Sequence, residues 1–202
     1  MNSTNKIILL AATIILFAGG IALWHFKTGE SSNQSVSFGE APQGGDFSLE
    51  SASGPFSLKG QRGKVVLLYF GYTHCPDVCP TTLTVIAQAF KVLKKDERAR
   101  VEAVFISVDP RRDTPKKLAV YTKFFSPGII GVTGTPDQIT RATKQYGAFY
   151  REVRNDTGSG YLINHSANIY VIAPDGTLNT ILPDATPPEK IDRTIRSLLS
   201  TQ

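Results

Sequence analysis

Short uninterrupted apolar runs alternate with amphipathic segments along most of the chain, a pattern typical of a mixed α/β domain. The run at residues 65–70 reads VVLLYF and is bounded by glycines, which predicts a strand covered on both faces. From Leu83 to Leu93, apolar residues recur at helical spacing, and Thr81 and Thr82 offer hydroxyls that can cap the start of a helix after Pro80. The sequence therefore predicts a buried strand, a loop and a helix in direct succession.

The remaining pattern predicts a leading hairpin, further strands and helices in alternation, and a closing hairpin and helix. We expect strands at residues 47–49, 56–58, 102–108, 129–132, 149–153, 167–172 and 178–182, and helices at residues 116–125, 136–146 and 187–199. At residues 114–115 and 135–136 a threonine cap precedes a proline, and residues 174–177 (PDGT) are a strong hairpin turn signal. This order predicts a thioredoxin-like α/β fold with an extra N-terminal hairpin and insertions.

The N-terminal segment differs in character from the rest of the chain. Residues 7–26 read IILLAATIILFAGGIALWHF, a run with His25 as its only strongly polar member and long enough to cross a hydrocarbon core of about 30 Å. A cleaved signal peptide is the alternative, but the run is longer than a signal core and lacks a convincing cleavage site. We therefore predict an uncleaved membrane anchor at residues 1–27, a flexible polar linker at residues 28–45 and one domain at residues 46–202.

Composition and charge narrow the classes of function. With 202 residues, of which 41% are hydrophobic and 19% charged, the chain can bury one well-packed domain. The net charge of +5 is spread along the chain without a basic run, so we expect no nucleic-acid partner. Lys6 and Lys27 flank the apolar run at residues 7–26 with little difference in charge, but the short tail ahead of a large domain favours export of that domain.

Cys75 and Cys79, the only cysteines, lie between the predicted buried strand and the predicted helix. Unpaired backbone N–H groups and the helix dipole stabilise a thiolate there, which favours both nucleophilic chemistry and metal binding. Three residues separate the cysteines, one more than in a thioredoxin-type motif, and a disulfide would close too small a loop to stabilise the fold much. We interpret the pair as a metal site that can also oxidise; a structural disulfide or two inert core thiols is the alternative.

The candidate for a third, distant ligand is His165. Of the three histidines, His25 lies at the end of the predicted anchor and His74 adjoins Cys75. Spacing alone leaves open whether His165 is a ligand or an ordinary hydrogen-bonded residue. Two thiolates and an imidazole would suit Cu(I) and adapt to Cu(II), whereas a structural zinc site requires four ligands.

A set of motifs carries a resemblance to a known family. The motifs are YFGYTHCPDVCPTTL at residues 69–83, VDP at 108–110 followed by RDTP at 112–115, HSA at 165–167 and PDG at 174–176. They resemble the SCO/SenC family of membrane-anchored copper chaperones, and the resemblance extends over roughly residues 45–199. It implies a thioredoxin-like domain that binds copper, as Cu(I) and Cu(II), through Cys75, Cys79 and His165, with a redox-active disulfide between the two cysteines.

The resemblance also implies a location and a partner. The domain would face the periplasm from a single-pass anchor in the inner (cytoplasmic) membrane, or the intermembrane space in mitochondria. It would deliver copper to the binuclear copper centre of cytochrome c oxidase subunit II, or reduce the cysteines of that centre, with an upstream copper donor and a thiol reductant of unknown identity. The chain departs from the family at Asn164, where Asp is frequent, and loss of that carboxylate is expected to alter the support of the histidine or the redox behaviour of the site.

We expect no enzymatic activity beyond a side activity as a thiol-disulfide reductase. A thiol-disulfide oxidoreductase or a redox sensor on the same fold is the alternative. Copper binding should depend on His165, whereas thiol exchange needs only the cysteines, so His165 discriminates between the two. Asp77, inside the cysteine loop, is a candidate for tuning the charge of the site or contacting the acceptor, although a solvated turn residue explains it as well. The aspartates of residues 109–115 are expected to serve turns and caps.

Overall fold

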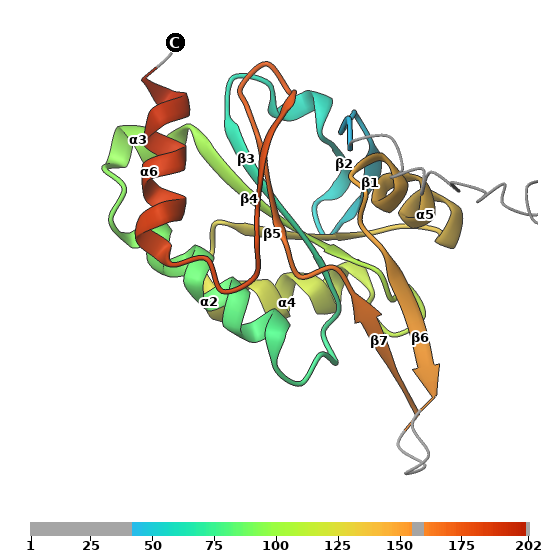
Figure 1. Cartoon of the computed structure of the whole chain (residues 1–202). Coiled ribbons are helices and arrows are strands. Elements are labelled where there is room, and N and C mark those ends of the chain that lie inside the picture. The colour runs from blue at the N-terminus through green and yellow to red at the C-terminus, as the bar shows by residue number, and fades with distance from the viewer. Residues whose placement is uncertain (1–41, 155–159, 201–202) are drawn as a thin grey trace, which may run out of the picture. The chain divides into compact units, whose positions relative to one another are not determined.

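The computed structural model describes residues 42–154 and 160–200, and its main sheet has seven strands in the order β2-β1-β5-β4-β3-β8-β9 (Figure 1). These strands are β1 (Ser48–Ser51), β2 (Gly54–Ser57), β3 (Val65–Gly71), β4 (Val101–Ser107), β5 (Ile129–Thr133), β8 (Ile169–Ile172) and β9 (Leu178–Leu182). The helices are the 3-10 turn η1 (Lys59–Gln61), α2 (Val78–Lys91), α3 (Lys95–Ala99), α4 (Pro115–Phe125), α5 (Pro136–Gln145) and α6 (Pro188–Leu199). A separate two-stranded sheet contains β6 (Tyr150–Arg154) and β7 (Tyr161–His165).

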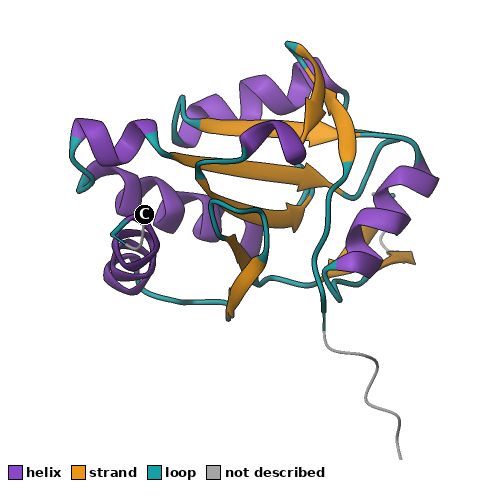
Figure 2. Ribbon diagram, turned by 90° about the horizontal axis from the view of Figure 1, so that it is seen from above, coloured by secondary structure: helices purple, strands orange, loops and turns teal. Residues whose placement is uncertain are grey.

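The strand β3 is buried along its whole length. It pairs in parallel with β4, from Val65 opposite Val101 to Gly71 opposite Ser107, and antiparallel with β8. Helices pack around the sheet (Figure 2). The helix α2 lies beside α6, and α4 packs against β5. The strand β4 is buried as well, except at Glu102, which is half-buried. Both β3 and β4 are thus the buried strands that the apolar runs predict. Because parallel neighbours end at the same edge of a sheet, the loops that follow β3 and β4 come together.

Two helices begin where the threonine-proline signals predict. Thr114 precedes Pro115 at the start of α4, and its side chain accepts a hydrogen bond from the Lys117 N–H at 3.3 Å. Thr135 forms a capping box with Gln138 at the start of α5. The hairpins β1–β2 and β8–β9 also form where the sequence predicts them. The predicted mixed α/β fold with an N-terminal hairpin is therefore confirmed.

Four elements differ from the prediction, one of them the short η1, which the pattern does not predict. The helix α2 begins at Val78 rather than after Pro80, with Asp77 as its N-cap and no side-chain capping bond. Pro80 therefore lies in the first helical turn, where its missing N–H leaves no helical hydrogen bond unmade, and Thr81 and Thr82 lie inside the helix instead of capping it. The pattern also predicts neither α3, which buries no residue and so lacks an apolar signal, nor β7, which depends on pairing with β6.

The β6–β7 hairpin lies outside the main sheet and extends beside the loop that precedes α2 (Figure 1). On β7, the Ile163 N–H donates a hydrogen bond to the Tyr72 hydroxyl at 3.1 Å. On β6, the Tyr150 hydroxyl lies 3.0 Å from the Thr140 hydroxyl of α5. Because β7 ends at His165, the hairpin carries that side chain toward the cysteine loop.

The predicted anchor at residues 1–27, including His25, lies outside the described residues, as does most of the predicted linker. Within residues 42–154 and 160–200, no helix combines the length and the apolar character needed to cross a membrane. The division into anchor, linker and domain stays a prediction.

Candidate metal centre

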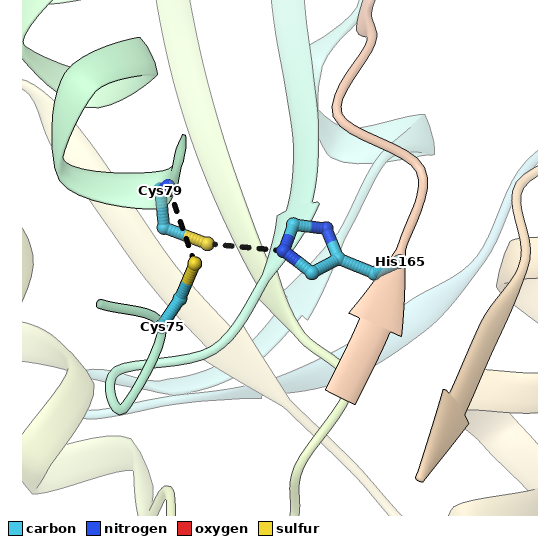
Figure 3. A group of neighbouring side chains, drawn as sticks. All are labelled: Cys75, Cys79 and His165. Atoms are coloured by element: carbon cyan, nitrogen blue, oxygen red, sulfur yellow. Dashed lines mark hydrogen bonds between the residues drawn. The ribbon is translucent and has the colours of Figure 1, made fainter. Parts of the chain in front are cut away.

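Cys75, Cys79 and His165 converge on one point, although 86 positions separate Cys79 from His165. Their ligand atoms all lie within 4.8 Å of one another, and the Cys79 Sγ is 3.3 Å from His165 Nε2 (Figure 3). Cys75 comes from the loop after β3, Cys79 from the first turn of α2 and His165 from the end of β7. In the described part of the chain, no other group of three His, Cys, Asp or Glu side chains could hold a metal ion.

The start of α2 determines the electrostatics of the cysteine pair. Because Cys79 lies in the first helical turn, its backbone N–H has no partner within the helix and donates to Cys75 Sγ at 3.4 Å. A hydrogen bond from the Cys79 thiol is the largest cause that lowers the pKa of Cys75 to about 4; burial opposes it, and the backbone N–H groups of Asp77 and Cys79 add to it. Burial, followed by the hydrogen bond with Cys75, raises the pKa of Cys79. The reduced pair thus carries one negative charge, on the more exposed sulfur.

Gly71, at the end of β3, leaves room for the buried sulfur. A β-carbon at this position would lie 2.7 Å from Cys79 Sγ and 2.7 Å from the Phe105 ring. Cys79 and Phe105 are both fully buried, so neither can move aside without disturbing the core. Any side chain at residue 71 would therefore displace the candidate ligand.

The orientation of His165 is fixed by its neighbours. Its Nδ1 lies 3.0 Å from the Ser166 carbonyl oxygen, and because a carbonyl only accepts, Nδ1 carries the proton. The lone pair of Nε2 therefore points toward the sulfurs. Tyr72 and Tyr69 contact the imidazole edge to face, with ring centroids 5.7 Å and 6.2 Å away. A fixed tautomer and ring orientation are typical of a metal-binding histidine.

Asp113 ties the cysteine loop to the loop after β4. Its buried carboxylate accepts hydrogen bonds from the Thr73 N–H at 2.9 Å, the Thr73 hydroxyl at 2.5 Å and the Ser107 hydroxyl at 2.7 Å. The Lys117 ammonium lies 3.5 Å away. Asp113 therefore does more than serve a turn, because it positions the backbone just before Cys75. The signal that could have revealed this role is the meeting of two loops at the end of parallel neighbouring strands.

Arg112 connects the same loop to β7. Its guanidinium pairs with buried Asp109, donates to the Tyr161 carbonyl at 2.9 Å and lies 3.7 Å from the centroid of the Tyr161 ring. The Tyr161 hydroxyl donates to Asp109 at 2.7 Å. This cluster holds the first residue of β7, and His165 is the last.

The other candidates from the cysteine loop lie at the edge of the centre. Asp77 is exposed at the N-cap of α2, and its backbone N–H contributes to the low pKa of Cys75. His74 is exposed, with Nδ1 at 3.2 Å from the Thr73 hydroxyl, and does not join the group of three ligands.

Asn164 lies beside the centre without supporting the histidine directly. It is exposed on β7 opposite Arg151. The Nδ1 partner of His165 is the Ser166 carbonyl, so the residue at position 164 does not set the tautomer of the imidazole. The expectation that Asn164 alters the redox behaviour of the site stays a prediction.

A buried hydroxyl faces the sulfurs from the core side. Tyr69 is 1% exposed, and within the described residues its hydroxyl has no hydrogen-bond partner. Burial first and the neighbouring Cys79 second raise the pKa of Tyr69, which keeps it protonated. The hydroxyl is therefore available to donate to Cys79 when that sulfur becomes a metal-bound thiolate.

The three ligands fit one soft metal ion. Bonds of about 2.3 Å in a trigonal site separate the donor atoms by about 4 Å, close to the spacing already present. Two thiolates and a neutral imidazole favour copper over the hard ions that oxygen ligands bind. The geometry thus needs little adjustment to hold the metal that the donor set prefers.

Comparison with known proteins gives consistent matches. Residues 37–200 match the SCO1/SenC family model. A relative from Bos taurus, Protein SCO2 homolog, mitochondrial, is 38% identical over 154 residues, which cover 75% of this chain and 58% of that protein. The chain spans 50 to 58% of the length of this relative and of those from Arabidopsis thaliana and Saccharomyces cerevisiae.

Two solved structures share the fold. ScoI of Arabidopsis thaliana with copper bound matches with a TM-score of 0.72 and 34% identity, covering 79% of this chain and 99% of that one. ScoI of Bradyrhizobium japonicum with copper bound matches with a TM-score of 0.70 and 35% identity, covering 77% and 98%. The thioredoxin-like fold expected from the motifs is confirmed, and the chain belongs to the SCO1/SenC family.

Proposed function

We propose that this protein is a copper chaperone that binds copper through Cys75, Cys79 and His165 and acts in the assembly of cytochrome c oxidase. The single observation that carries the proposal is the convergence of these three ligand atoms within 4.8 Å. Membership of the SCO1/SenC family and the copper held by two relatives of known structure support it. Copper is then cargo, which the site must both take up and release.

Differences in exposure set an order for the release of copper. Cys75 and His165 are partly exposed, whereas Cys79 is fully buried. A thiolate of the acceptor reaches the ion from the exposed side and replaces His165 or Cys75 first, so Cys79 is the last ligand to leave. Each new copper–sulfur bond forms as one bond to this chain breaks, so Cu(I) keeps its oxidation state and the ion is never without ligands.

The acceptor and the location follow from the same proposal. We infer that the acceptor is the binuclear copper centre of cytochrome c oxidase subunit II, and that residues 1–27 anchor the domain to the inner membrane with the site facing the periplasm. The apolar run at residues 7–26 supports the anchor. Protease added outside intact inner-membrane vesicles of periplasm-out orientation should digest the domain, and recovery of the full chain from the cytoplasmic fraction would contradict this location.

Thiol–disulfide exchange is the second candidate function. The low pKa of Cys75, about 4, beside the buried Cys79 favours it, because one sulfur is a thiolate at neutral pH and the other can resolve a mixed disulfide. In this case electrons pass from the two thiols to an acceptor disulfide, which becomes a dithiol, while Cys75 and Cys79 become a disulfide. We propose this reaction as a side activity rather than the main role.

The variant His165→Ala separates the two functions. Cu(II) is harder than Cu(I) and should gain more from the imidazole, whereas two thiolates hold Cu(I) in near-linear geometry. The variant should therefore lose the thiolate-to-Cu(II) charge-transfer absorption and at least about tenfold in Cu(II) affinity, but retain Cu(I) binding and disulfide formation. Parallel titrations with both copper states and a thiol-exchange assay measure these effects.

Two controls make this experiment decisive. Cys79→Ser should lose stoichiometric binding of both copper states, while His74→Ala should bind copper as the wild type does, because His74 lies outside the ligand group. An unchanged Cu(II) spectrum in His165→Ala would remove His165 from the site and favour the thiol-exchange function.

A further inference from the structure

The β6–β7 hairpin exposes apolar side chains on one face. Val153 and Leu162 stand directly opposite each other in the two strands, and they are 37% and 39% exposed. Phe149, which immediately precedes β6, is 61% exposed. The solvated face of an antiparallel pair is expected to be polar, so apolar residues grouped there indicate an interaction surface.

The hairpin does not use these residues for its own attachment. Alternate residues of a strand point to opposite faces, and the other face holds Ile163, which is buried, and Tyr161, which Arg112 covers. Tyr150 lies on that face as well, within hydrogen-bond distance of Thr140. The domain therefore packs against one face of the hairpin, and the apolar residues on the opposite face stay 37 to 61% exposed.

The exposed face continues into the candidate metal centre. A cleft of about 820 Å³ is lined by Phe149, Arg151 and Leu162 on the hairpin and by Cys75, Pro76 and Val78 on the cysteine loop. His165 also lines it. Any protein that brings its own ligands to the partly exposed Cys75 and His165 through this cleft must therefore contact the hairpin.

Arg151 gives the same surface a positive charge. Within the described residues, Arg111 pairs with Glu152 and Arg112 pairs with Asp109, whereas the exposed Arg151 has no ion pair. A pair of incoming thiolates is negatively charged, so an unpaired guanidinium beside the cleft attracts it. The charge on the hairpin thus complements the chemistry that accepts copper.

We propose that Phe149, Arg151, Val153 and Leu162, here called the hairpin face, dock the segment of the copper acceptor that carries its receiving thiolates. The proposal rests on the proposed function and adds the surface that recognises the partner. The occupant is an apolar loop of net negative charge: its apolar side chains cover the three apolar residues, and its acidic groups or thiolates meet Arg151. Asp77, on the opposite wall of the cleft, repels that charge and favours contact on the hairpin side.

The rate of copper transfer tests the proposal. Full-length wild type, Leu162→Ser and Arg151→Glu, each in detergent and loaded with one Cu(I), are mixed with the copper-free metal-binding domain of cytochrome c oxidase subunit II. Each variant should lower the second-order rate constant by at least about tenfold, because docking contacts and electrostatic steering are both lost. Capture of the same Cu(I) by bicinchoninate should change by less than about twofold, because a small chelator needs no docking surface.

Matched controls make comparable substitutions at exposed residues outside the cleft. Val120→Ser removes an apolar side chain that is 75% exposed on α4, and Arg141→Glu reverses an exposed charge on α5. Neither residue lines the cleft, so both variants should transfer copper at the wild-type rate. Higher salt should slow transfer from the wild type more than from Arg151→Glu, because screening removes an attraction that the variant lacks.

The outcomes separate the two proposals. Wild-type rates of transfer to subunit II in both hairpin variants would overturn the hairpin face as the docking site and leave the proposed function standing. Equal losses in the control variants would also overturn it, because the effect would not depend on the cleft. If loaded wild type gives no copper to the subunit II domain while bicinchoninate still removes it, the proposed acceptor is wrong and the docking proposal falls with it.

Discussion

The cysteine side and the histidine side of the candidate metal centre are attached to the domain in different ways. The cysteines lie between the buried strand β3 and α2, and Asp113 holds the backbone of Thr73 just before them. His165 ends a strand of the separate two-stranded sheet, whose contacts with the domain include single polar side chains such as Tyr72 and Arg112. The core therefore fixes the two sulfurs directly, whereas the imidazole is held through a hairpin outside the main sheet, by buried Ile163, by the Tyr69 and Tyr72 rings and by a few polar contacts.

This difference suits a site that takes up and releases its ion. Two thiolates in a fixed arrangement retain Cu(I) by themselves, and a histidine on a separately attached hairpin adds most to Cu(II). Segments with fewer buried contacts open at lower free-energy cost than the core does. We infer that exchange of copper begins on the histidine side.

Asp113→Asn should have the largest effect, because it loosens the cysteine side. The change places amide N–H groups against three donors and removes a charge that they stabilise, so we expect a loss of about 3 kcal/mol in unfolding free energy. Affinity for Cu(I) and for Cu(II) should fall together. Urea unfolding and copper titrations measure these losses, and Asp137→Asn, an exposed aspartate at the start of α5, should change stability by less than about 0.5 kcal/mol. Loss of Cu(II) affinity alone would contradict the role given to Asp113.

Arg112→Lys should have a smaller and selective effect, because it loosens only the histidine side. Lysine keeps a positive charge near Asp109 but cannot reproduce the flat stacking on Tyr161 together with the bond to its carbonyl. We expect Cu(II) affinity to fall roughly tenfold and Cu(I) affinity by less than about threefold. Arg141→Lys, at an exposed arginine on α5 that does not line the cleft, is the control and should leave both unchanged. Equal losses for both oxidation states would show that the two sides do not act separately.

The smallest expected effect concerns the cysteine side in the absence of metal. With a pKa of about 4, Cys75 stays a thiolate at neutral pH, so its rate of alkylation by iodoacetamide should hold steady down to about pH 5 and fall as the pH drops through about 4. An ordinary thiol would lose reactivity already below a pH of about 8.5. Because this folded pKa is depressed, the thiolate stabilises the fold above the pKa of the unfolded thiol, and that stabilisation is lost as the pH falls toward 4.

Two variants test which side of the centre lowers the pKa of Cys75. Cys79→Ala removes the largest cause of the depressed pKa and should raise the midpoint of the alkylation profile more than His165→Ala does. A profile in the wild type that is centred near pH 8.5 would show that neither the Cys79 thiol nor the backbone N–H groups at the start of α2 stabilise the thiolate.

Local sequence was sufficient to predict the cysteine side. The apolar run of β3, the helical spacing after Pro80 and the two cysteines between them all belong to one stretch, and each element forms from its own residues and neighbours. The start of α2 was the exception, since Pro80 is compatible with the first turn of a helix as well as with a preceding loop. That ambiguity matters, because the position of Cys79 inside the helix is what provides its free N–H to Cys75.

The histidine side could not be located from spacing. His165 lies 86 positions from Cys79, and β7 exists through pairing with β6 rather than through a local signal. Elimination among the three histidines made His165 the candidate, and the resemblance to a family implied that it is a ligand. The role of Asp113 was missed for a related reason: its three hydrogen bonds reach Thr73 and Ser107, which no periodicity connects.

The shape of the candidate metal centre affects the kinetics of copper loading and copper transfer. Tyr69, Gly71 and Tyr72 are buried behind the sulfurs and the imidazole, so within the described residues the cleft beside Cys75 is the route by which another protein can reach the ion. On the proposed function, donor and acceptor then use the same opening in turn and compete for it. Steady-state transfer should follow double-displacement kinetics, with parallel lines in reciprocal plots, and an excess of unloaded acceptor should slow loading by competing with the donor for the empty site.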